Sequence, residues 1–144
     1  MAKKKKPGGL RLEIAVPEGF EPAETEPGEP LTMLNDSIGA AFQISIQPGA
    51  AEGEDWDDDD LIGFAVQTGA DEGVEPSMTA AEDCEMGRYG MASFSRPEQP
   101  LSMIWFLTDG THVLVATLIC SDPPSEEQLQ AVWETVHALN LVPA

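Results

Sequence analysis

The two histidines, His112 and His137, are the side chains of this sequence best suited to act as a general base. Nucleophilic catalysis needs a serine, threonine or cysteine held beside such a base. Neither histidine lies near a Gly-x-Ser-x-Gly or Cys/His signature. We therefore predict a structural or surface role for both, no catalytic residues, and a protein that is not an enzyme. A pocket that placed His112 beside a carboxylate would favour an enzyme instead.

The two cysteines, Cys84 and Cys120, have no neighbouring cysteine or histidine at the spacings typical of zinc sites. We predict that both remain thiols and act as small core residues. The 13 glycines are scattered, and no Gly-Lys-Ser or Gly-Lys-Thr sequence marks a phosphate-binding loop. No cofactor is therefore predicted.

An acidic run surrounds a tryptophan in the middle of the chain. The candidate partner-binding residues are Glu54, Asp55, Trp56, Asp57, Asp58, Asp59 and Asp60. A calcium loop starting at Asp55 would have Asp60 in place of its turn glycine and Val66 in place of its closing glutamate, so no metal site is predicted. Two interpretations stay open, a solvated helix start and a patch for a basic partner. Trp56 would be a binding hot spot in the second, or it would attach the helix start to the core.

The charge of the chain is strongly asymmetric. It has 26 Asp and Glu against 7 Lys and Arg, for a formal net charge of −19, and all four lysines lie at positions 3–6. After them only Arg11, Arg88 and Arg96 are basic. Such a body repels nucleic acids and anionic membranes and attracts cationic surfaces. We predict a basic protein partner, a toxin or secreted effector, and no binding of nucleic acid or membrane by the folded body. Solubility or a salt-loving host would also explain the acidity.

Residues 1–9 are predicted to form a flexible basic tail, and residues 10–144 a single α/β domain. The basic start is followed by Pro7, Gly8 and Gly9, where a secretory signal would have an apolar run. No stretch has the apolar length of a membrane span. We therefore expect a cytoplasmic protein. The lysines of the tail have no assigned role, with nucleic acid, ribosomes and the acidic body all open as contacts.

Hydrophobic periodicity predicts the elements of the first half of the chain. Strands are expected at residues 10–16, 31–35 and, most clearly, 41–47, with a loop at 21–30. A helix is expected over residues 56–68, with residues 57–60 in its first turn. Its inward stripe should consist of Leu61, Phe64, Ala65 and Thr68.

The second half of the chain is predicted to add strands and a final helix. Strands are expected at 78–85, 88–95, 101–107 and 111–120, the last two joined by a type I′ turn at Asp109-Gly110 and buried on both faces. Ser125 and Gln128 predict a capping box. The helix behind it should dock through the apolar stripe Leu129, Val132, Trp133, Val136 and Leu139.

Short motifs resemble those of the Mog/PsbP/DcrB-like fold family. They are Val-Pro-Glu-Gly-Phe at 16–20, Gly-Arg-Tyr-Gly-Met-Ala-Ser-Phe at 87–94, Trp-Phe-Leu at 105–107 and Val-Trp-Glu-Thr-Val-His-Ala-Leu at 132–139. The resemblance implies an α+β fold: an antiparallel sheet of about six strands, with a mid-chain helix and a C-terminal helix packed on it. It also implies adaptor roles, including type VI secretion effector chaperones and immunity proteins, although the acidic run and basic tail depart from typical effector chaperones.

The leading prediction is thus a non-catalytic cytoplasmic protein-binding module, an acidic immunity-type inhibitor or secretion-effector chaperone. Its acidic face would bind a cationic partner. The alternative is a ligand-binding or homodimeric protein with an apolar groove, whose acidity confers solubility or reflects a halophilic host. Salt-sensitive binding distinguishes the first from the second.

Overall fold

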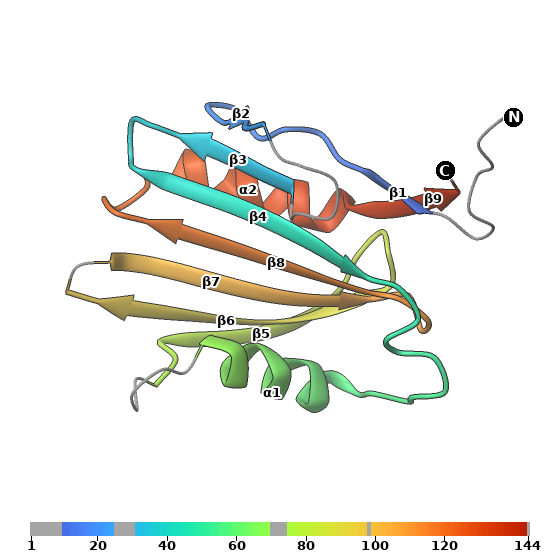
Figure 1. Cartoon of the computed structure of the whole chain (residues 1–144). Helices are drawn as coiled ribbons and strands as arrows, with labels where there is room; N and C mark the ends of the chain where they lie inside the picture. Colours follow the sequence, from blue (N-terminus) through green and yellow to red (C-terminus); the bar gives the residue numbers. More distant parts are fainter. Residues whose placement is uncertain (1–9, 25–30, 70–74, 98, 144) are drawn as a thin grey trace, which may run out of the picture.

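The computed structural model describes residues 10–24, 31–69, 75–97 and 99–143 (Figure 1). The predicted basic tail lies outside this part. The elements in chain order are β1 (Leu10–Glu13), β2 (Glu21–Pro22), β3 (Leu31–Asn35), β4 (Ala40–Gln47), α1 (Asp58–Gly69), β5 (Met78–Asp83), β6 (Arg88–Arg96), β7 (Gln99–Thr108), β8 (Val113–Cys120), α2 (Glu126–Ala138) and β9 (Asn140–Pro143).

Seven strands form one antiparallel sheet in the order β2-β3-β4-β8-β7-β6-β5, and β1 pairs with β9 in a separate two-stranded sheet. The predicted α+β architecture is confirmed, with one strand more in the main sheet than expected. The apolar strands β7 and β8 lie in the middle of this sheet, and most side chains on both of their faces are therefore buried.

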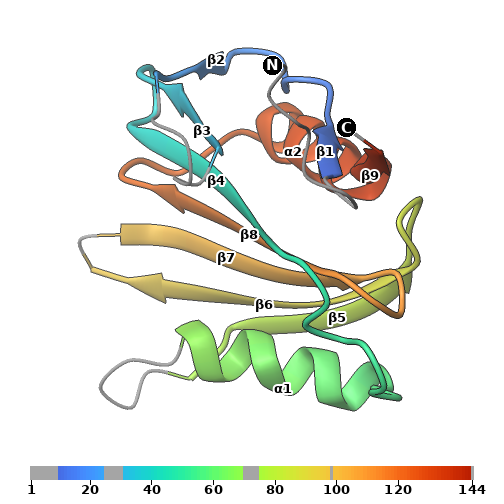
Figure 2. The same cartoon turned by 45° about the vertical axis from the view of Figure 1, so that its right-hand side comes forward.

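The two helices lie on opposite faces of the main sheet. Helix α1 packs against β5, β6 and β7 on one face. Helix α2 covers the other face, and the β1–β9 pair lies beside it (Figures 1 and 2). No helix in the described ranges is long and apolar enough to cross a membrane.

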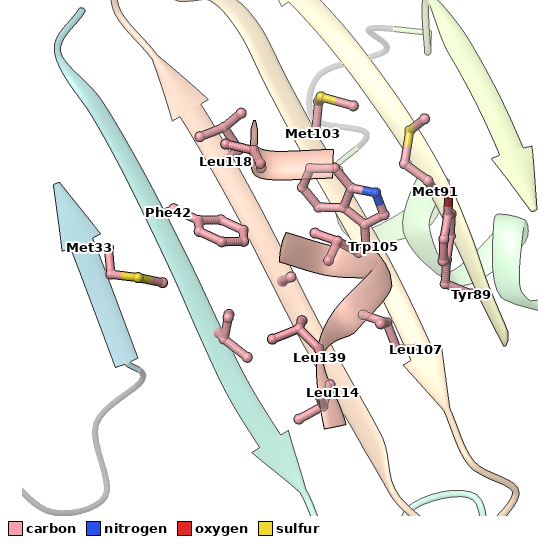
Figure 3. Close-up of a cluster of buried hydrophobic side chains, with 14 of the residues drawn as sticks. Met33, Phe42, Tyr89, Met91, Met103, Trp105, Leu107, Leu114, Leu118 and Leu139 are labelled. Atoms are coloured by element: carbon pink, nitrogen blue, oxygen red, sulfur yellow. The ribbon is translucent and has the colours of Figure 1, made fainter. Parts of the chain in front are cut away.

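The larger hydrophobic core lies between the sheet and α2 (Figure 3). Alternate residues of the strands point into it, and Val132, Val136 and Leu139 close it from the helix side. Phe42 lies at its centre, with its ring in edge contact with Phe20 at 6.3 Å and with Trp105 at 6.2 Å between centroids. This core holds α2 on the sheet.

A smaller core fixes α1 on the opposite face. It consists of Ala65 from the helix and Ala92, Phe94 and Ile104 from the sheet. Helix α1 covers only β5 to β7. On the same face of the sheet, the end of β8 is therefore exposed to solvent, and Ile119 is 39% exposed. The prediction that β8 is buried on both faces is therefore wrong at this residue.

Other local predictions are also corrected. Strand β1 ends at Glu13 and pairs with β9, which no pattern indicated. The expected loop at 21–30 begins with the short strand β2. Helix α1 starts two residues later than predicted, and Thr68 is exposed. The β7–β8 connection has four residues, since Thr108 pairs with Val113, and it is not a two-residue type I′ turn.

The start of α2 is confirmed as predicted. The Gln128 N–H donates to Ser125 Oγ at 3.1 Å, and the Ser125 N–H donates to Gln128 Oε1 at 2.8 Å. This reciprocal pair satisfies two backbone donors that the first helical turn leaves free. Trp133, a member of the predicted docking stripe, packs against Tyr89 and Trp105 at about 6 Å between ring centroids.

Candidate functional site

The acidic run lies at one end of the main sheet, where the chain enters α1. Residues 54–57 precede the helix, and Asp58, Asp59 and Asp60 form its first turn. Every carboxylate of the run is exposed, whereas Trp56 is partly buried. The carboxylates of the run are thus accessible from solvent, but they have different structural roles.

Two of the aspartates form a capping box for α1. The Asp60 N–H donates to Asp57 Oδ1 at 2.9 Å, and the Asp57 N–H donates to Asp60 Oδ2 at 3.0 Å. The Leu61 N–H donates to the Asp57 carbonyl at 3.1 Å, which makes Asp57 the N-cap. Both carboxylates also face the positive end of the helix dipole. Asp57 and Asp60 therefore have a structural role that is sufficient to explain them.

A third aspartate connects the helix to the sheet. Asp58 Oδ1 accepts a hydrogen bond from Arg88 Nη1 of β6 at 3.1 Å, and both side chains are largely exposed. An exposed ion pair of this kind contributes little to stability, roughly 0–1 kcal/mol. Its main consequence is local: the positive charge of Arg88, beside the acidic run, is paired with the carboxylate of Asp58.

The remaining part of the run opens onto a pocket of about 350 Å³. Glu54, Asp55 and Trp56 line it together with Asp83 at the end of β5 and Asp109 from the β7–β8 connection. Sequence reasoning missed Asp83 and Asp109, which are 26 residues apart in the chain. Their placement depends on the pairing of β5, β6 and β7, which brings the ends of β5 and β7 to the same end of the sheet.

Trp56 is held by aromatic contacts. Its ring meets Phe64 of α1 edge-on at 4.8 Å between centroids, and Phe64 in turn contacts Phe106 of β7 at 5.7 Å. The indole thus attaches the helix start to the sheet and also lines the pocket. The two roles predicted for Trp56 are compatible, because one part of a large ring can pack while another remains accessible.

This arrangement suits recognition of a cationic side chain. Carboxylates accept hydrogen bonds from an ammonium or guanidinium group, and an indole attracts a cation over its face. Of the cationic side chains in the described ranges, only Arg88 lines the pocket, and it is paired with Asp58. The pocket therefore presents more negative than positive groups to a ligand.

Solved structures with a similar fold include two proteins of different origin. The crystal structure of LpqN, involved in cell envelope biogenesis of Mycobacterium tuberculosis, matches with a TM-score of 0.58 and 13% identity over 96% of this chain and 87% of that one. The solution structure of cyanobacterial PsbP (CyanoP) from Synechocystis sp. PCC 6803 matches with a TM-score of 0.52 and 9% identity over 99% and 98%. The chain has a PsbP-like fold. No protein-family model matches the sequence, and no curated protein matches it either.

In this PsbP-like fold the histidines make defined contacts. His112 Nδ1 accepts a hydrogen bond from the Gly49 N–H at 3.0 Å, which ties the β7–β8 connection to the loop after β4. His137 Nε2 lies 2.8 Å from the Tyr89 hydroxyl and 3.1 Å from Glu82 Oε1, linking α2 to β6 and β5. Tyr89 also donates to Glu82 at 3.0 Å. Burial and this carboxylate raise the pKa of Tyr89, so its hydroxyl stays a donor.

Both cysteines of the PsbP-like domain are free thiols. Burial raises the pKa of the Cys120 thiol to about 11, and burial is also the main cause of the raised pKa of Cys84. The thiolate is the nucleophilic form, so both are poor nucleophiles near neutral pH. Within the described ranges, no group of three or more His, Cys, Asp or Glu side chains is arranged to hold a metal ion.

Replacing Asp57 with alanine is expected to lower the free energy of unfolding by about 1 kcal/mol, because the Asp60 N–H loses its capping acceptor. Chemical denaturation followed by tryptophan fluorescence measures the change. Asp59→Ala is the matched control, since it removes an exposed carboxylate from the same helical turn without removing a cap. Equal losses in the two variants would contradict the structural role of Asp57.

Proposed function

We propose that this chain is a non-catalytic protein-binding module whose acidic pocket binds a basic segment of a partner protein. The observation that carries the proposal is the convergence of Glu54, Asp55 and Trp56 with Asp83 and Asp109 around one pocket. Three separate segments contribute carboxylates to it, and the indole of Trp56, which also lines it, is fixed by packing against Phe64. Such a site selects lysine or arginine by charge and by contact with the aromatic face.

The partner is proposed to be a toxin or secreted effector with a basic surface. The chain would then act as an immunity-type inhibitor or as a secretion-effector chaperone in the cytoplasm. The support is the charge of the chain, −19 overall, which attracts cationic proteins and repels nucleic acids and anionic membranes. If the partner's basic surface binds nucleic acid, the acidic pocket would compete with phosphates for the same arginines and lysines.

The test combines neutralisation of the pocket with affinity capture. The triple variant Glu54→Gln/Asp55→Asn/Asp83→Asn keeps the shape of the side chains and removes three pocket charges. Immobilised on beads in host lysate at low salt, the unaltered chain should retain a basic protein that high salt releases. The triple variant should bind that protein about tenfold or more weakly, because several charge contacts are lost together.

A second triple variant controls for total charge. Glu18→Gln/Asp36→Asn/Glu127→Gln removes the same number of exposed carboxylates from positions that do not line the pocket. It should retain the partner nearly as well as the unaltered chain, since exposed charges beyond a Debye length are screened. If both triple variants bind the basic protein equally, the acidic pocket is not the binding site.

An apolar groove favours a second candidate function. Met78, Met103, Leu129 and Trp133 line a volume of about 380 Å³ between the sheet and α2. In this alternative the groove takes an apolar ligand or a second copy of the chain, and the acidity confers solubility or reflects a halophilic host. It predicts a complex or dimer that persists at high salt, so the same capture experiment separates it from the acidic-pocket proposal.

A further inference from the structure

The apolar groove lies beside an open edge of the main sheet. Met78, the first residue of β5, is 48% exposed and lines the groove together with Met103 of β7 and with residues of α2, among them Leu129 and Trp133. Methionine side chains are flexible and adapt to different apolar ligands. Strand β5 is the last strand in the order of the sheet, so the groove opens directly onto an edge.

The backbone of β5 offers hydrogen-bonding groups along that edge. Cys84 and Gly87 exchange both backbone hydrogen bonds at 3.0 Å in the turn after β5. Backbone groups of an antiparallel strand point alternately toward and away from the partner strand. Thr79, Ala81 and Asp83 therefore direct their N–H and C=O groups away from β6, and no hydrogen bond in the described part of the chain engages them.

The edge lacks lysine, proline and a bulge, and its only charges are the acidic Glu82 and Asp83. Exposed edge strands are commonly blunted by lysine, proline or a bulge. The β5 sequence Met-Thr-Ala-Ala-Glu-Asp contains neither residue, and its register with β6 is regular from Met78 to Asp83. Its small alanines leave the backbone accessible to another strand.

The same edge joins the groove to the acidic pocket. Met78 lines the groove at one end of β5, and Asp83 lines the acidic pocket at the other. These two residues have opposite parity, so their side chains lie on opposite faces of the sheet. The strand has 6 residues and spans roughly 20 Å. An added strand of similar length would reach both sites with alternate side chains.

We propose that β5 is the docking edge for an extended segment of the partner protein, which adds to the sheet as a further strand. The segment places an apolar side chain in the groove beside Met78 and a lysine or arginine in the pocket beside Asp83. This inference rests on the proposed function and specifies how the basic partner binds. Main-chain hydrogen bonds give affinity in this mode, and alternate side chains give specificity.

Charge determines which kind of strand fits the edge. The charged side chains around this edge and its two sites are mainly acidic. They are Glu82 and Asp83 at the end of β5, Glu126 in the lining of the groove, and Glu54 and Asp55 in the pocket. A strand with lysine or arginine complements them. A second copy of β5 contains no basic residue and would leave Glu82 and Asp83 without a cationic partner, so a basic segment fits this edge better than a second copy does.

The probe for the test is a fluorescent peptide of about eight residues that alternates leucine and lysine. Two N-methylated versions carry the methyl groups either on every leucine or on every lysine amide. Only one of these sets faces β5 when the peptide adds as a strand. We expect the unmodified peptide and one methylated version to bind in fluorescence anisotropy, and the other to bind about tenfold or more weakly. Equal binding of both methylated versions, or no binding of the unmodified peptide, would overturn the proposal.

Amide exchange locates the bound peptide on the full chain. The amides of Thr79, Ala81 and Asp83 should exchange with solvent at least about tenfold more slowly when the peptide is present. Ala81→Pro removes one backbone N–H donor of the edge without removing a hydrogen bond to β6. It should lower the affinity for the peptide by about tenfold. Ala81→Ser is the matched control, and thermal unfolding verifies that both variants fold. Unchanged exchange at all three amides would overturn the docking edge.

The outcome also separates this inference from the acidic pocket itself. If the pocket triple variant loses the peptide while N-methylation and Ala81→Pro have no effect, the acidic-pocket function stands and strand addition at β5 is overturned. If sedimentation shows a dimer of the unaltered chain that Ala81→Pro converts to monomer, a second copy occupies the edge and the partner-segment proposal is overturned.

Discussion

Replacing Gly90 with alanine is expected to lower the free energy of unfolding by about 3 kcal/mol. Gly90 lies on β6 directly under α1, where a Cβ atom would overlap the backbone of Leu61 and Ile62. A backbone neighbour has no rotamer through which to move away, so the whole helix has to shift from the sheet. Alanine is otherwise better than glycine in a strand, so any loss must come from this overlap.

Gly63→Ala is the matched control for this change. Gly63 is an exposed residue in the same helix, and a Cβ there meets nothing within 4 Å. It should raise the stability by about 1 kcal/mol, because alanine is the better helix former. Urea unfolding followed by tryptophan fluorescence measures both variants. A Gly90→Ala protein as stable as the unaltered chain would show that α1 does not approach the sheet this closely.

Replacing Phe42 with alanine is expected to cost about 3–5 kcal/mol of stability. The Phe42 side chain is fully buried in the larger core, in edge contact with Phe20 and Trp105. Its removal leaves a cavity at the centre of the layer that holds α2, and the neighbouring rings are too constrained to fill it. The loss of these two aromatic contacts adds to the loss of buried area.

Gln43→Ala tests the same strand on its other face. Gln43 is exposed, and its amide donates to the Thr32 hydroxyl at 3.2 Å. We expect the free energy of unfolding to change by no more than about 0.5 kcal/mol, as for most surface substitutions. Calorimetric or chemical unfolding of the two variants gives the comparison. Similar losses for Phe42→Ala and Gln43→Ala would contradict the assignment of the core to one face of β4.

Local patterns of the sequence predicted much of the fold. The alternation at residues 41–47 indicated β4, and the Ser125 and Gln128 pair indicated the start of α2. The acidic residues before Leu61 indicated the entry into α1. These signals are reliable because they depend on interactions between residues that are two to four positions apart, which the chain makes in any fold that contains the element.

Pairings between distant segments were not predictable in this way. The β1–β9 pair joins residues more than 120 positions apart. The extent of α1 over the sheet decided that Ala65 is buried while Ile119 is exposed. Such outcomes depend on which surfaces meet in three dimensions, because hydrophobic burial has no preference for neighbours in the chain.

The candidate site shows the same division. The sequence by itself determined the composition of the acidic run, the presence of Trp56 within it and the charge that favours a cationic partner. Only the tertiary structure separated the capping aspartates 57 and 60 from the pocket-lining Glu54 and Asp55, and added Asp83 and Asp109 to them. The reason is physical: charge and side-chain type are properties of single residues, whereas a pocket exists only where strand pairing and helix packing bring separate segments together.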